Sequence, residues 1–288
     1  MNELISNVEK KFIDIDTVIK NKNARLFALL PPFVLNYIKR IVHESQINDF
    51  ISKNKDKYEL DFVDAILKEF DLNLKVIGKN NIPPNGGCIF ASNHPLGALD
   101  AMALTSVVGS VRKDIKFVVN DILLHLKNLK SLFVPVNKHG RNSPEIVQQL
   151  ETVYTSDNAV LIFPAGLVSR KHRGGIIKDL TWKKSFITRS KKYKKNVIPV
   201  YIDGENSDFF YNLALWRERI GIKANIEMFY LVNEMYKQKN KTITIIIGEQ
   251  IPYETFNKIH SDHYWAEKIK EYVYSLPKEK KPFKKVEV

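Results

Sequence analysis

Two residues in the segment SNHPLGALD, His94 and Asp100, have the types and the spacing to act together in acid–base chemistry. An imidazole has a pKa near neutral, and a neighbouring carboxylate holds its ring in one tautomer, as a general base requires. A lone histidine beside an aspartate is more often structural than catalytic. The pair taken alone therefore leaves both interpretations open.

Predicted elements on either side of this segment bring the two side chains together. Cys88–Ala91 is typical of a short buried strand, and the apolar run from Ala101 to Leu104 indicates a helix. Pro95 and Gly97 interrupt regular backbone between them. We expect the histidine at the end of the strand and the aspartate in the first turn of the helix, where a carboxylate is favoured.

The chain from Leu72 onward alternates short apolar runs with helical patterns, which predicts an α/β fold with a largely parallel central sheet flanked by helices. Residues 1–71 are predicted to form an N-terminal helical segment and residues 72–288 the catalytic domain. The clearest helices begin near Ser143 and Ser261, and Tyr58–Phe70 has a core-facing stripe. The expected strands are Leu74–Ile77, Cys88–Ala91, Lys116–Val119, Phe133–Val136, Val160–Phe163, Val197–Ile202, Ile226–Val232 and Thr242–Ile247.

Three later segments each follow or form a predicted strand. Asn137–Arg141 precedes the helix near Ser143, so Arg141 would lie beside free backbone N–H groups and make an anion site, although an isolated surface arginine is commoner. Val160–Gly166, with the sequence VLIFPAG, is a strand ending in proline and glycine, a pattern of little meaning alone. Val197–Val200 is a further apolar strand that contains a proline.

Together and in this order, the four segments resemble the signature blocks of the glycerolipid acyltransferase family, which includes the lysophosphatidate acyltransferases. The resemblance spans residues 92 to 200. It implies that His94 deprotonates an acceptor hydroxyl, which attacks an acyl thioester, while Asp100 orients the histidine. It also implies that the substrate-binding residues are Asn93, Gly140, Arg141, Phe163, Pro164, Ala165, Gly166 and Arg170, with Arg141 on the acceptor's phosphate.

Two departures from the family pattern bear on the acceptor. Five residues separate His94 from Asp100 where the family usually has four, and Leu99 occupies the usual aspartate position. Ala165 replaces the glutamate of the family's Phe-Pro-Glu-Gly block. Both departures resemble the bacterial branch that acylates lyso-forms of amino-acid lipids, so a lyso-ornithine or lyso-glycine lipid is the alternative acceptor.

The charge distribution indicates anionic partners. The chain has a net charge of +13, and residues 170–195 contain eleven Lys or Arg against one acid, Asp179. Such a run is usually a solvated face, but it also suits anionic membrane lipids or an acidic acyl carrier protein. No RNA-binding or helix-turn-helix signature accompanies the charge, so nucleic acid is not expected as a partner.

Membrane attachment is expected to be peripheral, on the cytoplasmic face of the inner membrane. Residues 24–51 are predicted either to lie in a membrane interface or to pack as ordinary helices on the domain. The apolar stretch from Leu26 to Ile38 is broken by Pro31-Pro32 and falls short of the roughly 20 residues that a span needs. No signal peptide is evident, and the single cysteine, Cys88, fits a reducing compartment.

Other chemistries lack their motifs. The sequence has no Gly-x-Ser-x-Gly, no phosphate-binding or dinucleotide glycine loop, and no His-Glu-x-x-His or Cys-x-x-Cys pattern. We therefore expect no metal and no cofactor apart from the acyl thioester co-substrate, carried by acyl carrier protein or coenzyme A. The function predicted is a membrane-associated O-acyltransferase acting on a lysolipid. The competing class is a non-catalytic, basic membrane- or nucleic-acid-binding protein.

Overall fold

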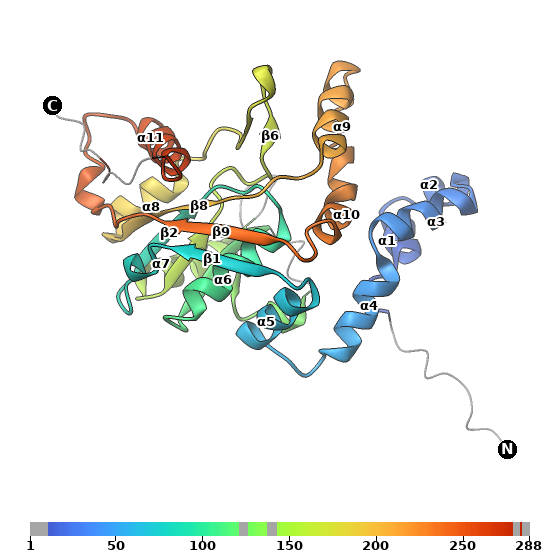
Figure 1. Ribbon diagram of the computed structural model, residues 1–288, viewed down its shortest axis with the longest axis horizontal. Coiled ribbons are helices and arrows are strands. Elements are labelled where there is room, and N and C mark those ends of the chain that lie inside the picture. The colour runs from blue at the N-terminus through green and yellow to red at the C-terminus, as the bar shows by residue number, and fades with distance from the viewer. Residues whose placement is uncertain (1–10, 121–125, 137–142, 279–282, 284–288) are drawn as a thin grey trace.

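A computed structural model describes residues 11–120, 126–136, 143–278 and 283, which form a central sheet with helices on both faces (Figure 1). The seven strands lie in the order β1-β9-β8-β2-β5-β3-β4. Their bounds are β1 Asn73–Ile77, β2 Cys88–Ser92, β3 Ile115–Asn120, β4 Phe133–Val136, β5 Ala159–Ile162, β8 Asn196–Ile202 and β9 Thr242–Ile247. A separate hairpin pairs β6 Arg170–Lys171 with β7 Ile177–Lys178.

The predicted α/β fold with a largely parallel sheet is confirmed. Every neighbouring pair of the seven strands is parallel except β8 and β9, so β1 and β9 run opposite to the rest. The sheet order matters for chemistry because β2 lies between β5 and β8 and runs parallel to both. The carboxyl ends of these three strands therefore meet at one edge, where ligands bind in open α/β sheets.

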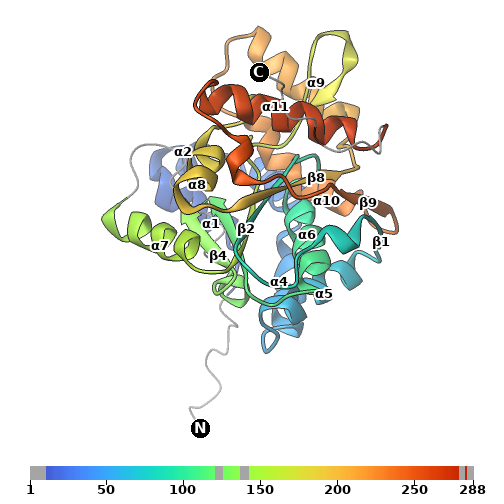
Figure 2. The ribbon, with the colours of Figure 1, turned by 90° about the vertical axis from the view of Figure 1, so that its left-hand side faces the viewer.

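Helices cover the two faces of the sheet, as Figure 2 shows for α7 and α8 on one side of β2 and α5 and α6 on the other. Alternate residues of β2 point to opposite faces, so Phe90 belongs to one core cluster and Ile89 to the other. The helices have the bounds α1 Ile15–Lys22, α2 Ala24–Leu29, α3 Pro32–Ile41, α4 Glu44–Lys53, α5 Glu59–Glu69, α6 Ala98–Gly109, α7 Pro144–Thr155, α8 Ser185–Tyr193, α9 Asp208–Arg219, α10 Leu231–Tyr236 and α11 Asp262–Ser275. Short 3-10 turns are η1 Lys79–Asn81, η3 Lys127–Leu129, η4 Arg173–Gly175, η5 Ile226–Tyr230 and η6 Tyr253–Thr255.

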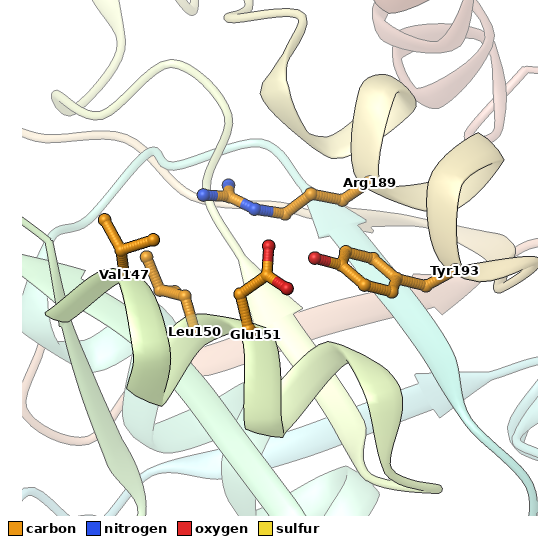
Figure 3. Close-up of a pocket in the computed structure, with 5 residues that line it drawn as sticks. All are labelled: Val147, Leu150, Glu151, Arg189 and Tyr193. Carbon is orange, nitrogen blue, oxygen red and sulfur yellow. The ribbon is translucent and has the colours of Figure 1, made fainter. Parts of the chain in front are cut away.

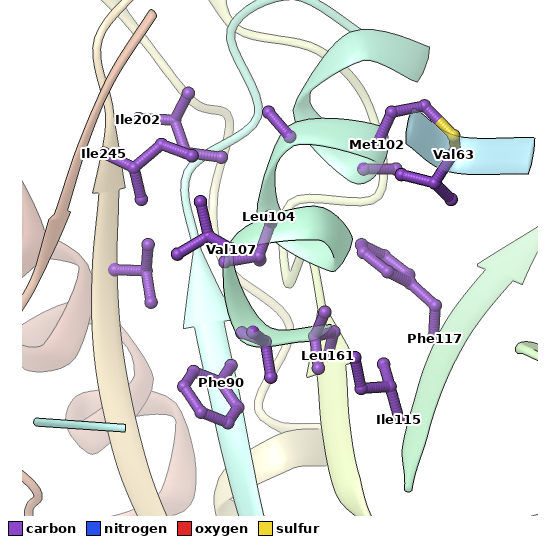
Figure 4. Packing of buried hydrophobic residues seen from close by; sticks show 14 of the residues in the cluster. Val63, Phe90, Met102, Leu104, Val107, Ile115, Phe117, Leu161, Ile202 and Ile245 are labelled. Atoms are coloured by element: carbon purple, nitrogen blue, oxygen red, sulfur yellow. The ribbon is translucent and has the colours of Figure 1, made fainter. Parts of the chain in front are cut away.

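Helix α6, which follows the His94 loop, lies between the sheet and α5 and is buried on nearly every side. Figure 4 shows Leu104 and Val107 of α6 against Ile245 and Phe90 of the sheet. A helix that is apolar all round belongs in a core. The first turn of α6 is consequently fixed by packing, and Asp100 is fixed with it.

The predicted helix starts at Ser143 and Ser261 are confirmed. Each serine is an N-cap whose hydroxyl oxygen accepts a backbone N–H, from Ile146 at 3.5 Å and from Tyr264 at 3.2 Å. The predicted core stripe of α5 is also confirmed, since Phe62 and Val63 are buried in the cluster around α6.

The predicted strand Ile226–Val232 is wrong, because this segment forms η5 and the start of α10. Helical spacing directs Met228 and Leu231, three residues apart, into a small cluster with Phe210, and it buries Glu227. A strand would have placed residues three apart on opposite faces. The apolar composition of the run suited either structure, and tertiary packing decided between them.

The helices α1 to α4 lie beside α10 and η5 at one end of the molecule (Figure 1). The hydroxyl groups of Tyr37 in α3 and Tyr230 in η5 are 2.7 Å apart and share a hydrogen bond. The same region leaves Leu29 and Phe33 exposed, at 79% and 73%. No helix in the described parts of the chain is long and apolar enough to cross a membrane. The division of the chain at residue 72 stays a prediction.

Candidate active site

The ends of the parallel strands β2 and β5 supply the centre of the candidate site. His94 follows β2 by two residues, and Phe163 follows β5 directly. Their rings stack, with centroids 4.0 Å apart and an interplanar angle of 13°. The first and third sequence segments, about seventy residues apart, are therefore in contact because their strands are neighbours in the sheet.

His94 and Asp100 face each other across the loop between β2 and α6. The imidazole Nδ1 lies 3.0 Å from Asp100 Oδ2, which also accepts the backbone N–H groups of Leu96 at 2.7 Å and Gly97 at 3.0 Å. Gly97 has a φ of +88°, a conformation that favours glycine. The predicted contact is thus confirmed, and Leu99, at the family's usual aspartate position, is a fully buried core residue.

The hydrogen bonds of Asp100 determine which nitrogen of His94 is free to act as a base. A carboxylate oxygen accepts hydrogen bonds, so Nδ1 is the nitrogen that carries the proton, and Nε2 keeps a lone pair. No protein group among the described residues hydrogen-bonds Nε2, and the side chain of His94 is 17% exposed. Burial raises the pKa of Asp100, while its hydrogen bonds with His94, Leu96 and Gly97 act in the opposite direction.

A second buried carboxylate, Asp179, contacts the main chain of His94. The N–H of His94 donates to Asp179 Oδ1 at 3.2 Å, and the carbonyl of His94 accepts the N–H of Ser169 at 2.8 Å. In the sequence, Asp179 stands out only as the one acid in a basic run, and it was not predicted as a site residue. Its position shortly before Trp182, an apolar residue in a charged stretch, was the signal that this part of the chain turns into the core.

The turn after β5 has the compact form expected of a strand ending in proline and glycine. The N–H of Gly166 donates to the carbonyl of Phe163 at 3.0 Å. Pro164 and Ala165 are buried, whereas Gly166 is exposed. Ala165 packs in the same core cluster as Phe186, so a neutral methyl group occupies the position at which the family's usual pattern has glutamate.

Two residues predicted to bind substrate make their hydrogen bonds within the protein. Asn93 is buried and exchanges two hydrogen bonds with the backbone of Ile202, at 2.8 and 2.7 Å, which joins the ends of β2 and β8. Arg170 is also buried, with Nη2 2.7 Å from Glu227 Oε1 and its guanidinium over the ring of Phe210. Gly140 and Arg141 lie outside the described residues. Substrate binding by all these residues stays a prediction.

The basic run of residues 170–195 is not a single solvated face, and that interpretation is wrong for Arg170. Three lysines near the end of α8 form ion pairs: Lys191 with Asp262, Lys192 with Glu151, and Lys195 with Asp157. Lys183 and Lys184 are exposed, and neither forms a salt bridge with the residues that the structure describes. Lys183 and Lys184 thus add exposed positive charge just before α8, as Arg173, Lys178 and Lys194 do elsewhere in the run.

Two pockets border α8. One, of about 60 Å³, lies between α7 and α8 and is lined by Val147, Leu150, Glu151, Arg189 and Tyr193 (Figure 3). The other is an open pocket of about 390 Å³ lined by Lys183, Lys184, Ser185, Thr188 and Arg189. Neither is lined by His94. The open pocket does adjoin the turn after β5, because the N–H of Lys183 donates to the carbonyl of Pro164 at 3.0 Å.

Comparison with known proteins shows the family of this chain. The model of a family described as acyltransferase matches residues 17–279. The chain belongs to this acyltransferase family. The predicted resemblance and the predicted enzyme class are thereby confirmed, and the non-catalytic alternative is set aside.

Two curated relatives are similar over almost the whole chain. A lyso-glycine lipid O-acyltransferase of Phocaeicola vulgatus is 42% identical over 265 residues, covering 92% of this chain and 95% of the relative. A protein of the same name from Bacteroides thetaiotaomicron is 43% identical over 265 residues, covering 92% and 97%. Among solved structures, the 1-acyl-sn-glycerophosphate acyltransferase of Thermotoga maritima covers 86% of this chain and 93% of its own, with 17% identity and a TM-score of 0.45.

Proposed function

We propose that this acyltransferase moves a fatty acyl group from an acyl thioester to the free hydroxyl of a lysolipid, with a lyso-glycine lipid as the preferred acceptor. The observation that carries the chemistry is the 3.0 Å contact between His94 Nδ1 and Asp100 Oδ2, which leaves Nε2 as an available base. The acceptor is supported by the two relatives named lyso-glycine lipid O-acyltransferase, at 42% and 43% identity.

The proposed reaction uses His94 twice. Nε2 takes the proton of the acceptor hydroxyl as its oxygen attacks the thioester carbonyl, and Asp100 stabilises the imidazolium that forms. The carbon–sulfur bond then breaks, and the departing sulfur receives the proton from Nε2. The products are the ester and a free thiol, so atoms and charge balance. Phe163 keeps the ring in plane through its stacked contact.

The acceptor preference rests on the turn after β5. Ala165 leaves this turn without the carboxylate that would hydrogen-bond the hydroxyl groups of a glycerol backbone. A lyso amino-acid lipid, whose free hydroxyl lies on a fatty chain, presents mainly carbon to that position. Lysophosphatidate is the second candidate, supported by the order of the four sequence segments.

A direct competition tests the acceptor. Purified enzyme would be given one acyl thioester with lyso-glycine lipid or with lysophosphatidate, and kcat/KM measured for each. We expect the higher value for lyso-glycine lipid, and Ala165→Gly as a matched variant should keep that order because it adds no carboxylate. A clear preference for lysophosphatidate would reject the amino-acid-lipid proposal and leave the phospholipid one.

We propose that the thioester donor is anionic and binds near the start of α8. Lys183 and Lys184 form no salt bridge within the described structure, and they line the open pocket beside the Pro164 turn. Acyl carrier protein and coenzyme A both bring phosphate to such a surface. Lys183→Gln with Lys184→Gln should raise KM for the donor, and Lys192→Gln, in α8 but already paired with Glu151, is the control. An unchanged donor KM in the double variant would contradict donor binding at Lys183 and Lys184.

We further propose peripheral attachment to an anionic membrane, on the cytoplasmic face of the inner membrane, through α2 and α3. The exposed side chains of Leu29 and Phe33 lie on helices that also carry Arg25 and Arg40. Leu29→Ser with Phe33→Ser should weaken flotation with anionic vesicles. Tyr58→Ser, a change at an exposed aromatic residue outside α2 and α3, is the control. Equal binding of wild type to neutral and anionic vesicles would contradict the electrostatic part.

A further inference from the structure

We infer that Asp179 is a positioning residue for the acyl transfer, acting through the main chain of His94. The inference deepens the proposed function, because it takes His94 as the general base. It assigns a task to a residue that does not touch the substrate. The task is to hold the end of β2 so that the imidazole ring stays aligned with Asp100 and Phe163.

The first support is the hydrogen bonding of the Asp179 carboxylate. Oδ1 accepts the N–H of His94 at 3.2 Å and the hydroxyl of Ser169 at 2.6 Å. Oδ2 accepts the indole N–H of Trp182 at 2.9 Å. The side chain is fully buried, and every one of these donors is a neutral group. A buried charge is costly unless hydrogen bonds satisfy it, and here both oxygens are satisfied.

The second support is that the backbone N–H and the backbone carbonyl of His94 both bind the segment from Ser169 to Asp179. The N–H of His94 binds Asp179, and its carbonyl binds the N–H of Ser169, which itself donates its hydroxyl to Asp179. His94 lies beyond the last residue of β2, so these bonds replace the sheet bonds that a strand residue would have. The ring is thus held by Asp100 and Phe163, and the backbone by Asp179 and Ser169.

The third support is that Asp179 is anchored from outside the hairpin. Its own N–H donates to the hydroxyl of Tyr274 in α11 at 2.8 Å. Burial and the Asp179 charge raise the pKa of Tyr274, which keeps its hydroxyl neutral. Trp182, just before α8, is fully buried in the core. The position of the catalytic histidine therefore depends on α8 and α11 as well as on its own loop.

An asparagine cannot reproduce this arrangement. An amide offers one acceptor oxygen and an NH2 group, whereas the site presents donors to both oxygens of the side chain. In Asp179→Asn, the NH2 group must face either the indole N–H of Trp182 or the donors on the Oδ1 side. The His94 backbone then loses part of its support, and the ring shifts from the productive geometry.

The test is a kinetic one. We expect Asp179→Asn to lower kcat about tenfold or more while KM for donor and acceptor changes less than about twofold, because neither substrate contacts the residue. Trp182→Phe, which removes one donor to the same carboxylate, should give a smaller loss of the same kind. Asp208→Asn, at an exposed carboxylate paired with Lys171 of the hairpin, is the matched control and should leave kcat unchanged.

A double-mutant cycle separates positioning from a general structural defect. If Asp179 acts through His94, its substitution should cost less in an Asp100→Asn background, where His94 has already lost the charge that stabilises its imidazolium, than in wild type. Independent, multiplicative effects would contradict the inference, as would an unchanged kcat in Asp179→Asn. Thermal unfolding of each variant shows whether it is folded. Should Asp179→Asn not fold, Ser169→Ala and Trp182→Phe carry the same test. Near-normal turnover in His94→Ala would instead reject the proposed function itself.

Discussion

The two segments that hold His94 differ in what each carboxylate does. Asp100, from residues 92–100, contacts the ring through one oxygen that accepts three N–H groups, and its Oδ1 has no hydrogen-bond partner in the described part of the chain. Asp179, from the segment after the hairpin, has both oxygens hydrogen-bonded and contacts only the backbone of the histidine. In the proposed mechanism, the first carboxylate faces a group that gains and loses a proton, and the second holds the backbone of that group in position. The ring of His94 is therefore held by one carboxylate and its backbone by the other.

Among the variants that separate the role of Asp100 from that of Asp179, Asp100→Asn is expected to lower kcat the most. The amide oxygen can still accept the N–H groups of Leu96 and Gly97, so the loop should keep its form. The stabilisation of the imidazolium is lost, and kcat should fall by about 100-fold or more. Initial rates at saturating donor and acceptor measure this. A loss no larger than that of Asp179→Asn would contradict the division of tasks.

A smaller effect is expected from Phe163→Ala, which removes the ring that stacks on His94 at 4.0 Å. An aromatic pair contributes about 0.5–1.5 kcal/mol beyond its buried area, so kcat should fall by up to about tenfold. Phe163→Tyr is the matched control, because it keeps the stacked ring. If both variants lose activity equally, the contribution of this turn lies in its shape and not in the stacking.

No change in substrate affinity is expected from Arg170→Met, despite the place of Arg170 in the basic run. Its guanidinium is buried against Glu227, which also pairs with Arg217. Removing one charged hydrogen-bond partner should cost about 2 kcal/mol of unfolding free energy, with KM for the acceptor unchanged. Arg141→Ala, by contrast, should raise that KM. A raised KM in Arg170→Met would instead support Arg170 as a substrate ligand.

The smallest effect concerns stability and pH. Burial raises the pKa of Asp100 above its usual 3.8, so the folded state binds this proton more tightly than the unfolded state does. Wild type therefore loses stability from this carboxyl as pH rises from about 3.8 through the raised pKa. The melting temperature of Asp100→Asn minus that of wild type should increase over the same interval. A difference that decreases with pH would contradict the sign.

The sequence predicted the first of the two segments and missed the second for a physical reason. His94 and Asp100 lie six residues apart, so local signals of a strand end, a turn and a helix start were enough to bring them together. Asp179 lies 85 residues from His94, and their contact depends on the order of strands in the sheet and on the burial of Trp182. The α/β pattern predicted the layers, because it follows from apolar periodicity.

Within the basic run of residues 170–195, charge alone did not predict which side chains are exposed. Arg170 and Lys183 look alike in the sequence, yet one is buried in an ion pair with Glu227 and the other is exposed beside a pocket. The strand expected at Ile226–Val232 failed for a related reason. Its apolar pattern gave no sign that Glu227 would turn inward to meet two arginines.

The most direct test of the account is the turnover of His94→Ala. The purified variant would be compared with wild type in acyl transfer from one acyl thioester to lyso-glycine lipid at saturating substrate, with thermal unfolding recorded in parallel. Loss of a general base should lower kcat by at least about 100-fold in a protein that remains folded. A folded His94→Ala variant with near-normal turnover would contradict the central claim that both buried carboxylates serve this histidine.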